Sequence, residues 1–254
     1  MPFDLLFFAA MVPAVVMTGL AKGGFSGLGL LSLPLMALVV SPVTAAAIML
    51  PLLIAQDVVS VWSYRRDFDR RNLATLAPGA LLGILMGYLL AAKVSDAAVV
   101  LAVGLISVGF ALRRMLSDGR KPAVATQANW SGGSLWGFVC GFTSMVAHAG
   151  GPPFQIYVMP QRLKPAVFVG TGAVFFAAMN LVKLVPYLAL GQLNGQNLLA
   201  SAALLPFAVA ATFAGVWLIR RVPAERFYGI VYWLLLLVGT KLVYDGAREL
   251  HLLG

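Results

Sequence analysis

Long apolar segments follow one another along the whole chain, and this feature constrains the fold more than any other. A helix needs about 20 predominantly apolar residues to cross the hydrocarbon core of a bilayer. Segments of about that length are Phe3–Ala21, Val43–Trp62, Leu73–Ala92, Ala97–Leu116, Trp130–Ala147, Ala166–Leu190, Leu198–Ile219 and Phe227–Tyr244. With 61% hydrophobic residues, 11% charged residues and a mean hydropathy of +0.91, the chain has more apolar surface than a protein in water can bury. The sequence therefore predicts an all-α polytopic membrane protein with about eight to ten membrane segments.

Two shorter apolar pieces, Leu28–Val40 and Phe154–Pro160, each follow a glycine-rich stretch. The two stretches read AKGGFSG and HAGGPP. A helix over Leu28–Val40 covers only about 20 Å, which is less than the thickness of the hydrocarbon core. The pattern predicts a broken helical hairpin or helix pair at each place. The alternative is that Phe3–Ala21 simply spans and the glycines form a tight turn or serve close helix packing.

Arginine and lysine cluster between the apolar segments, in YRRDFDRRN, RRMLSDGRKP and IRRVPAER. Cytoplasmic loops of membrane proteins carry an excess of these residues, which places the clusters inside and both chain ends outside. The net charge of +9 is then explained by topology and by contact with anionic lipid, so no nucleic-acid partner is expected. The first apolar run has no basic residue ahead of it, so we expect a membrane segment and not a cleaved signal peptide.

Cys140 is the only cysteine, and the chain has two histidines. This composition excludes an internal disulfide and argues against a Cys/His metal site. We therefore expect no metal and no cofactor, and we interpret Cys140 as a small packing residue.

The second half of the chain repeats features of the first at an offset of about 127 residues. Gly23 and Gly24 correspond to Gly150 and Gly151, and the arginine-rich loop YRRDFDRRN corresponds to the uncharged loop GQLNGQN. Exchange of charge between matched loops is what an inverted repeat requires, because the two copies then face opposite sides of the membrane. The sequence predicts a first inverted repeat over 1–118, a cytoplasmic linker over 119–128 and a second inverted repeat over 129–254. Each repeat contains a glycine-broken helical hairpin plus three transmembrane helices.

The two breaks define the predicted substrate site. Inverted repeats with interrupted helices are typical of secondary transporters, and the exposed N-terminal amides of such helices bind anions near mid-membrane. The first break is expected to face the second, and the predicted substrate-binding residues are Lys22, Gly23, Gly24, Ser26, His148, Gly150, Gly151, Asn180 and Lys183. The predicted coupling or proton-binding residues are Gln56, Asp57 and His148, because ionisable and polar residues inside membrane helices tend to be functional.

Several of these residues also have a structural interpretation. Asp57 can extend toward Arg65 and Arg66 as an interfacial charge, and Lys183 can extend to the membrane surface. His148 can form a structural hydrogen bond to the broken backbone. Counting from the helix centres separates Asp57 and Lys183 by roughly 13 Å in depth, so a direct salt bridge between them is not predicted.

Two other classes of function, an enzyme and an anion channel, are alternatives to a carrier. Ser144 and His148 are four residues apart, which suits a nucleophile and its base if the helix continues through both. No second motif supports catalysis, so we expect that the protein is not an enzyme. An anion channel is the other alternative, and it differs from a carrier by lacking saturable flux with counterflow.

The stretches AKGGFSGLGL and AQDVVSVWSYRRDFDRRNL, with the weaker echo of the break in the second half, resemble the TauE/SafE-type sulfite exporter family, also called the toluene-sulfonate uptake permeases. The resemblance covers nearly the whole chain. It implies a secondary carrier in the bacterial inner membrane that moves small sulfur-containing anions, such as sulfite, sulfoacetate or other organosulfonates, usually outward. A proton- or cation-coupled uptake permease for organic anions is the nearest alternative. The residues alone indicate an anion and a carrier, whereas the sulfur comes from the resemblance.

Overall fold

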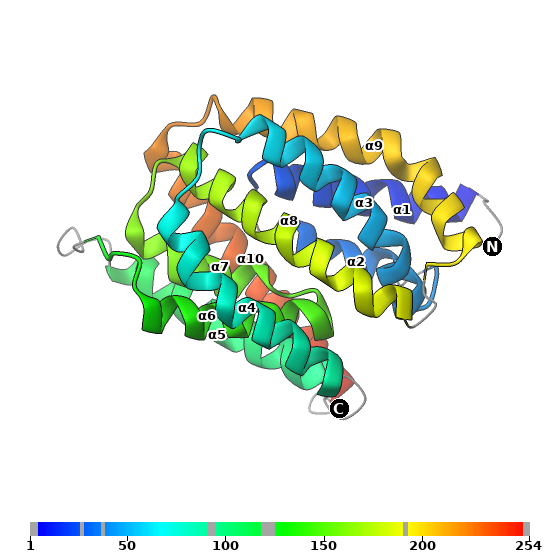
Figure 1. The fold of residues 1–254 in the computed structure, drawn as a ribbon, viewed down its shortest axis with the longest axis horizontal. Coiled ribbons are helices and arrows are strands. Elements are labelled where there is room, and N and C mark those ends of the chain that lie inside the picture. Colours follow the sequence, from blue (N-terminus) through cyan, green and yellow to red (C-terminus); the bar gives the residue numbers. More distant parts are fainter. Residues whose placement is uncertain are drawn as a thin grey trace. The chain divides into compact units, whose positions relative to one another are not determined.

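The computed structural model describes residues 5–25, 28–36, 39–90, 95–117, 125–189 and 193–250, and within these ranges every regular element is a helix (Figure 1). The helices are α1 (Leu5–Gly23), η1 (Leu28–Leu31), α2 (Ser32–Met36), α3 (Pro42–Ser63), α4 (Arg70–Leu90), α5 (Asp96–Ser117), α6 (Trp130–Ala147), α7 (Gly151–Val158), η2 (Met159–Gln161), α8 (Pro165–Ala189), α9 (Gly195–Ile219) and α10 (Ala224–Glu249). The long helices begin and end within a few residues of the apolar segments.

Six helices in the described part of the chain are long and apolar enough to cross a membrane: α1, α3 from Thr44, α4, α8, α9 and α10 from Gly229. The prediction of an all-α polytopic membrane protein is therefore confirmed. The other two predicted spans are also helical. In α5 the apolar part is shorter, Ala97–Leu112, and α6 is rich in glycine and serine.

Both glycine-rich stretches interrupt a helix. In the first, α1 ends at Gly23, and Gly24 has a positive φ of 146°, which residues with a side chain rarely adopt. In the second, α6 ends at Ala147, and His148 takes the left-handed conformation with a φ of 52° before α7 begins at Gly151. Each break is followed by a short helix, so the predicted interruptions are present.

The chain divides into two compact units, and each combines segments from the first and second halves of the sequence. Unit 1 contains Met1–Phe68 and Val169–Val222, and unit 2 contains Asp69–Phe168 and Pro223–Gly254. These units do not coincide with the predicted repeats 1–118 and 129–254, so the boundaries of the repeats stay a prediction.

In unit 1, α9 packs along both α1 and α3. Its core contains apolar residues from all three helices, including Met11, Ile48 and Leu204. Two glycines meet where α1 crosses α9, and a Cβ on Gly23 would lie 2.5 Å from Cα of Gly215. Small residues at such crossings allow two membrane helices to pack backbone against backbone.

In unit 2, α4 packs along α6 and α5 packs along α10. The side chains of Asn72 and Gln161 are buried and bond reciprocally, at 2.8 Å and 2.9 Å between amide nitrogens and oxygens. This pairing satisfies both amides and ties the start of α4 to η2.

Substitution of Gly104 in α5 is expected to destabilise unit 2. A Cβ at this position would lie 2.7 Å from the backbone nitrogen of Val243 in α10, so Gly104→Ala must push the two helices apart. We expect a loss of about 1–3 kcal/mol in the free energy of unfolding. Gly109 in the same helix is the matched control, because a Cβ there meets nothing within 4 Å. Thermal unfolding of the purified protein in detergent should show a lower midpoint for Gly104→Ala and no decrease for Gly109→Ala.

Candidate functional site

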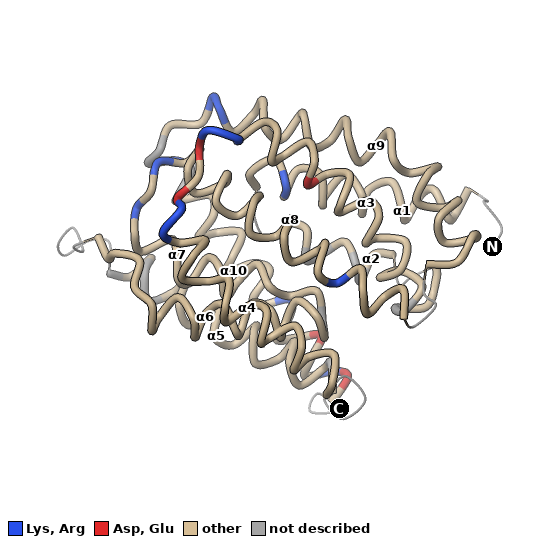
Figure 2. The backbone as a smooth tube through the Cα atoms, in the orientation of Figure 1, with Lys and Arg blue, Asp and Glu red and all other residues tan. Residues whose placement is uncertain are grey.

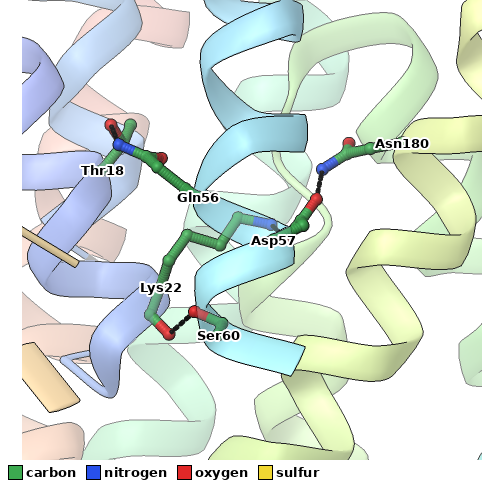
Figure 3. Close-up of polar contacts among 6 residues, drawn as sticks. All are labelled: Thr18, Lys22, Gln56, Asp57, Ser60 and Asn180. Atoms are coloured by element: carbon green, nitrogen blue, oxygen red, sulfur yellow. Dashed lines mark hydrogen bonds and ion pairs between the residues drawn. The ribbon is translucent and has the colours of Figure 1, made fainter. Parts of the chain in front are cut away.

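The centre of the candidate site is an ion pair between Lys22 and Asp57 in unit 1 (Figure 3). Lys22 lies in the last turn of α1, directly before the glycine break, and Asp57 lies in the C-terminal half of α3. The side chains are 14% and 5% exposed. A charge buried to this extent requires a partner, so each residue keeps the other inside the protein.

Asp57 has a second partner on α8. Nδ2 of Asn180 donates to the other carboxylate oxygen of Asp57 at 2.6 Å (Figure 3). Both oxygens of the carboxylate are therefore occupied, one by a lysine ammonium and one by an amide. Asp57 thus connects α1, α3 and α8 in unit 1 through polar contacts.

Lys183 adds a second lysine to this site. It lies one turn after Asn180 on α8, is 1% exposed, and is close enough to Lys22 and Asp57 for both charges to act on it. Phe176 is on the same face of α8, with the Nζ atom of Lys22 located 5.5 Å from the centroid of its ring. When all three residues are ionised, the two lysines and one aspartate have one positive charge in excess.

Two hydroxyl groups, one in α3 and one directly after it, hold the end of α1 in place. The hydroxyl of Ser60 donates to the carbonyl of Lys22 at 2.8 Å, and the hydroxyl of Tyr64 donates to the carbonyl of Gly23 at 2.7 Å. These two carbonyls have no partner within a helix that ends at Gly23. Burial raises the pKa of Tyr64 above its usual value, so its phenol keeps the proton that it donates. Asp57 and Ser60 lie on one face of α3, and Tyr64 is the C-cap residue of that helix.

Gln56 points to a different part of α1. Its Nε2 atom donates to the hydroxyl of Thr18 at 3.1 Å and to the carbonyl of Val15 at 3.3 Å (Figure 3). Its carbonyl oxygen is buried and has no hydrogen-bond partner. Gln56 therefore fixes α3 against α1 beside the charged cluster, and its role in coupling stays a prediction.

The described part of the first break closes the end of α1. The amides of Gly24 and Phe25 both donate to the carbonyl of Leu20, at 3.1 Å and 3.0 Å, because they close the C-terminal turn of α1. Gly23 lies against Gly215 of α9. The roles of Gly23 and Gly24 in substrate binding stay predictions, and Ser26 lies outside the described residues.

The second break belongs to unit 2, whereas Lys22 and Asp57 belong to unit 1. Gly150 is the N-cap residue of α7, so no side-chain hydrogen bond caps the start of this helix. Pro152 and Pro153 have no amide hydrogen, so α7 has fewer free donors at its start than an ordinary helix. The roles of His148, Gly150 and Gly151 in substrate binding, and the meeting of the two breaks, stay predictions.

Gln155 in α7 was missed by the sequence analysis. Its side chain is fully buried, and neither its amide nitrogen nor its oxygen has a hydrogen-bond partner among the described residues. A buried amide without partners costs about 1–3 kcal/mol, and a ligand or an ordered water is the usual reason that such a group is kept. The available signal was its position, since Gln155 is the one amide side chain in the piece GPPFQIYV after the second break.

The alternative interpretations of Asp57 and Lys183 are not supported by the geometry. Asp57 pairs with Lys22 and does not extend toward Arg65, and Lys183 is buried and does not reach the surface. A large difference in depth between Asp57 and Lys183 is expected only if α3 and α8 are centred at the same level and lie along the membrane normal. The contact between Asp57 and Asn180, one turn before Lys183, does not fit that arrangement.

The geometry also removes the basis for a Ser144–His148 pair on one helical face. That arrangement required the helix to continue, but α6 ends at Ala147 and His148 has left-handed backbone angles. The turn is instead closed by Thr143, whose hydroxyl and carbonyl both contact Ala149.

Long apolar helices that enclose an ion pair and a further lysine define a polytopic membrane protein with a polar site inside its spans. The chain matches the family model described as Sulfite exporter TauE/SafE over residues 11–242. It therefore belongs to this family, which is a family of membrane transporters, and the suspected resemblance is confirmed. No curated protein and no solved structure matches the chain.

Proposed function

We propose that the protein is a secondary carrier that exports small sulfur-containing anions, such as sulfite, sulfoacetate or another organosulfonate, by alternating access. The observation that carries this proposal is the buried cluster of Lys22, Asp57, Asn180 and Lys183, with two cationic residues and one anionic residue. Its excess positive charge is compensated by one bound anion. The preference for sulfur rests on the family match.

Binding in the proposed mechanism is an exchange of partners. An incoming sulfonate or sulfite oxygen takes the place of the Asp57 carboxylate at Lys22 and Asn180, and Lys183 provides further attraction. Desolvation of an anion is costly, so several donors must replace the water that it loses. The two lysines and the amide of Asn180 are such donors.

The same exchange provides a route for coupling to protons. Protonation of Asp57 would remove the charge that competes with the substrate for Lys22, so a proton and an anion would enter the site together. This role agrees with the position of Asp57 between the two donors. His148 and Gln56 remain candidate coupling residues.

Helix packing supports the proposed inverted repeat. If α1 corresponds to α6 and α9 corresponds to α4, then the packing of α1 along α9 in unit 1 has its counterpart in the packing of α4 along α6 in unit 2. In alternating access the substrate would bind near mid-membrane while the repeats exchange conformations. The proposed location is the bacterial inner membrane, with the basic loops in the cytoplasm and both chain ends outside.

Transport by the purified protein in liposomes tests the proposed function. Radiolabelled sulfite, sulfoacetate, taurine and sulfate are compared at equal concentration, with counterflow against unlabelled substrate. We expect saturable flux and counterflow for sulfite or an organosulfonate, and little for sulfate. Flux that does not saturate, with large single-channel currents, would indicate a channel, and accumulation driven inward by a cation gradient would indicate an uptake permease.

Substitution of Gln155 by leucine is expected to separate stability from transport. Leucine has a similar volume and no polar atoms, so Gln155→Leu should raise the free energy of unfolding by about 1–3 kcal/mol. If the amide of Gln155 binds a ligand during transport, the same change lowers the flux at least severalfold. Gln161→Leu is the contrasting variant, because Gln161 is bonded to Asn72 and its loss should destabilise. Unchanged flux in a stabilised Gln155→Leu protein would show that Gln155 does not bind a ligand during transport.

A further inference from the structure

A polar cavity lies in unit 1, apart from the buried ion pair. It has a volume of about 470 Å³ and is lined by Trp62, Ser63, Arg65, Arg66, Asp67, Phe213, Val216, Trp217 and Arg220. Three of these residues are arginines and one is an aspartate, so the cavity has an excess of positive charge. Figure 2 shows the basic residues of this region in the connection after α3 and in the turn after α9.

The cavity is located where two membrane helices end. The candidate spans of α3 and α9 end at Ser63 and Ile219, and the lining residues lie on both sides of these ends. Trp62 and Trp217 are 61% and 56% exposed, and Phe213 is also exposed. Exposed tryptophans at helix ends are typical of the level at which lipid headgroups meet the hydrocarbon core.

The arginines are held in place but keep free donors. Arg65 donates to the carbonyl of Trp62 and Arg220 donates to the carbonyl of Ser63, both at 2.9 Å. These bonds satisfy carbonyls in the last turn of α3. A guanidinium has five N–H donors, so each arginine keeps others for a ligand.

Aromatic rings orient the guanidinium groups of Arg65 and of Arg221, which follows the lining residue Arg220 in the chain. The guanidinium carbon of Arg65 lies 5.2 Å from the centroid of the Trp62 ring, and that of Arg221 lies 3.8 Å from the centroid of the Trp217 ring. Ordered guanidinium groups bind phosphate with less loss of side-chain freedom than mobile lysines do. The cavity thus combines an ordered cationic part with an exposed apolar rim.

We propose that this cavity binds the headgroup of an anionic phospholipid, with the phosphate on Arg65, Arg66 and Arg220 and the acyl chains along Phe213 and Trp217. A soluble phosphate or sulfonate would bind the same arginines, but it has no acyl chains to contact the exposed tryptophans and phenylalanine. Basic pockets beside membrane helices recognise anionic lipid through this combination of charge and apolar contact. The site is independent of the transport site proposed above.

The test uses the purified, delipidated full-length protein and counts bound lipid by native mass spectrometry. Phosphatidylglycerol and phosphatidylcholine with identical acyl chains are compared for the unmodified protein, for Arg65→Gln/Arg220→Gln and for Arg70→Gln/Arg71→Gln. The last variant loses the same number of positive charges, but from the start of α4, outside the cavity. We expect the unmodified protein and the control to prefer phosphatidylglycerol, and the cavity variant to lose this preference by roughly tenfold.

A further variant keeps the test decisive if loss of the Arg220 bond prevents folding. Arg66→Gln leaves both bonds to α3 intact, and it should also weaken the preference for phosphatidylglycerol. Equal preference in all variants would overturn the proposal. Complete displacement of phosphatidylglycerol by an equal concentration of glycerol 3-phosphate would also overturn it, because the cavity would then be a site for a soluble anion.

Discussion

Replacement of Lys22 by methionine is expected to abolish anion transport and to lower the free energy of unfolding by about 3–5 kcal/mol. The loss of stability follows from the geometry, since Asp57 would remain buried with Asn180 as its hydrogen-bond partner and without the ammonium that pairs with it. The loss of transport follows from the proposed role of Lys22 as a donor to the substrate. Chemical unfolding in detergent and sulfite flux in liposomes measure the two effects separately.

The double variant Lys22→Met/Asp57→Leu distinguishes a structural from a functional role. Apolar residues in place of a buried ion pair often fold as stably as the pair itself, so the double variant should regain most of the lost stability, less the cost of leaving the Asn180 amide without its acceptor. Transport should remain absent, because no donor replaces Lys22. A double variant that is stable and transports at the normal rate would show that the ion pair serves the fold alone.

Asp57→Asn is expected to uncouple transport from protons. Asparagine keeps the size of the side chain but cannot bind or release a proton in the physiological range. An imposed proton gradient should therefore no longer drive sulfite movement, whereas exchange of labelled for unlabelled sulfite should persist. Asp67→Asn is the matched control, because Asp67 lies in the loop after α3 and outside the charged cluster. A response to the gradient that is the same in Asp57→Asn and in the unmodified protein would exclude Asp57 as the coupling residue.

The positions of the helices could be predicted from the sequence because each span must supply its own apolar surface to lipid. The segment Val43–Trp62, for example, became α3 over Pro42–Ser63. Both breaks were also predictable, since glycines and prolines in AKGGFSG and HAGGPP disfavour a continuous helix. In each case the deciding information lies within about 20 consecutive residues.

The partners inside the site could not be predicted in the same way. The pairing of Lys22 with Asp57 depends on the end of α1 lying against α3, which is a property of the packed fold and not of either segment. A signal was present in the spacing, because Phe176, Asn180 and Lys183 share one face of α8. The bonds of the Gly24 and Phe25 amides could not be predicted for a related reason: these amides follow the C-terminal end of α1, where they satisfy a carbonyl of its last turn.

The division into units was not visible in the sequence either. The predicted repeats are consecutive halves of the chain, whereas each compact unit combines helices from both halves. Helix α9 packs on α1 across a long stretch of intervening sequence through Gly215 and Gly23. Such contacts depend on the shapes of two helix surfaces, and glycine spacing alone does not identify the partner helix.

Equilibrium binding of labelled sulfite to the purified protein tests the central claim most directly, namely that the buried cluster around Lys22, Asp57 and Lys183 holds the anion. The unmodified protein should bind at one saturable site. Lys183→Met should weaken that binding by roughly tenfold or more, because it removes a buried charge close to the site. Lys241→Met, which removes an exposed lysine paired with Asp245, should leave the affinity unchanged. Equal affinity in the Lys183→Met and Lys241→Met proteins would contradict the account.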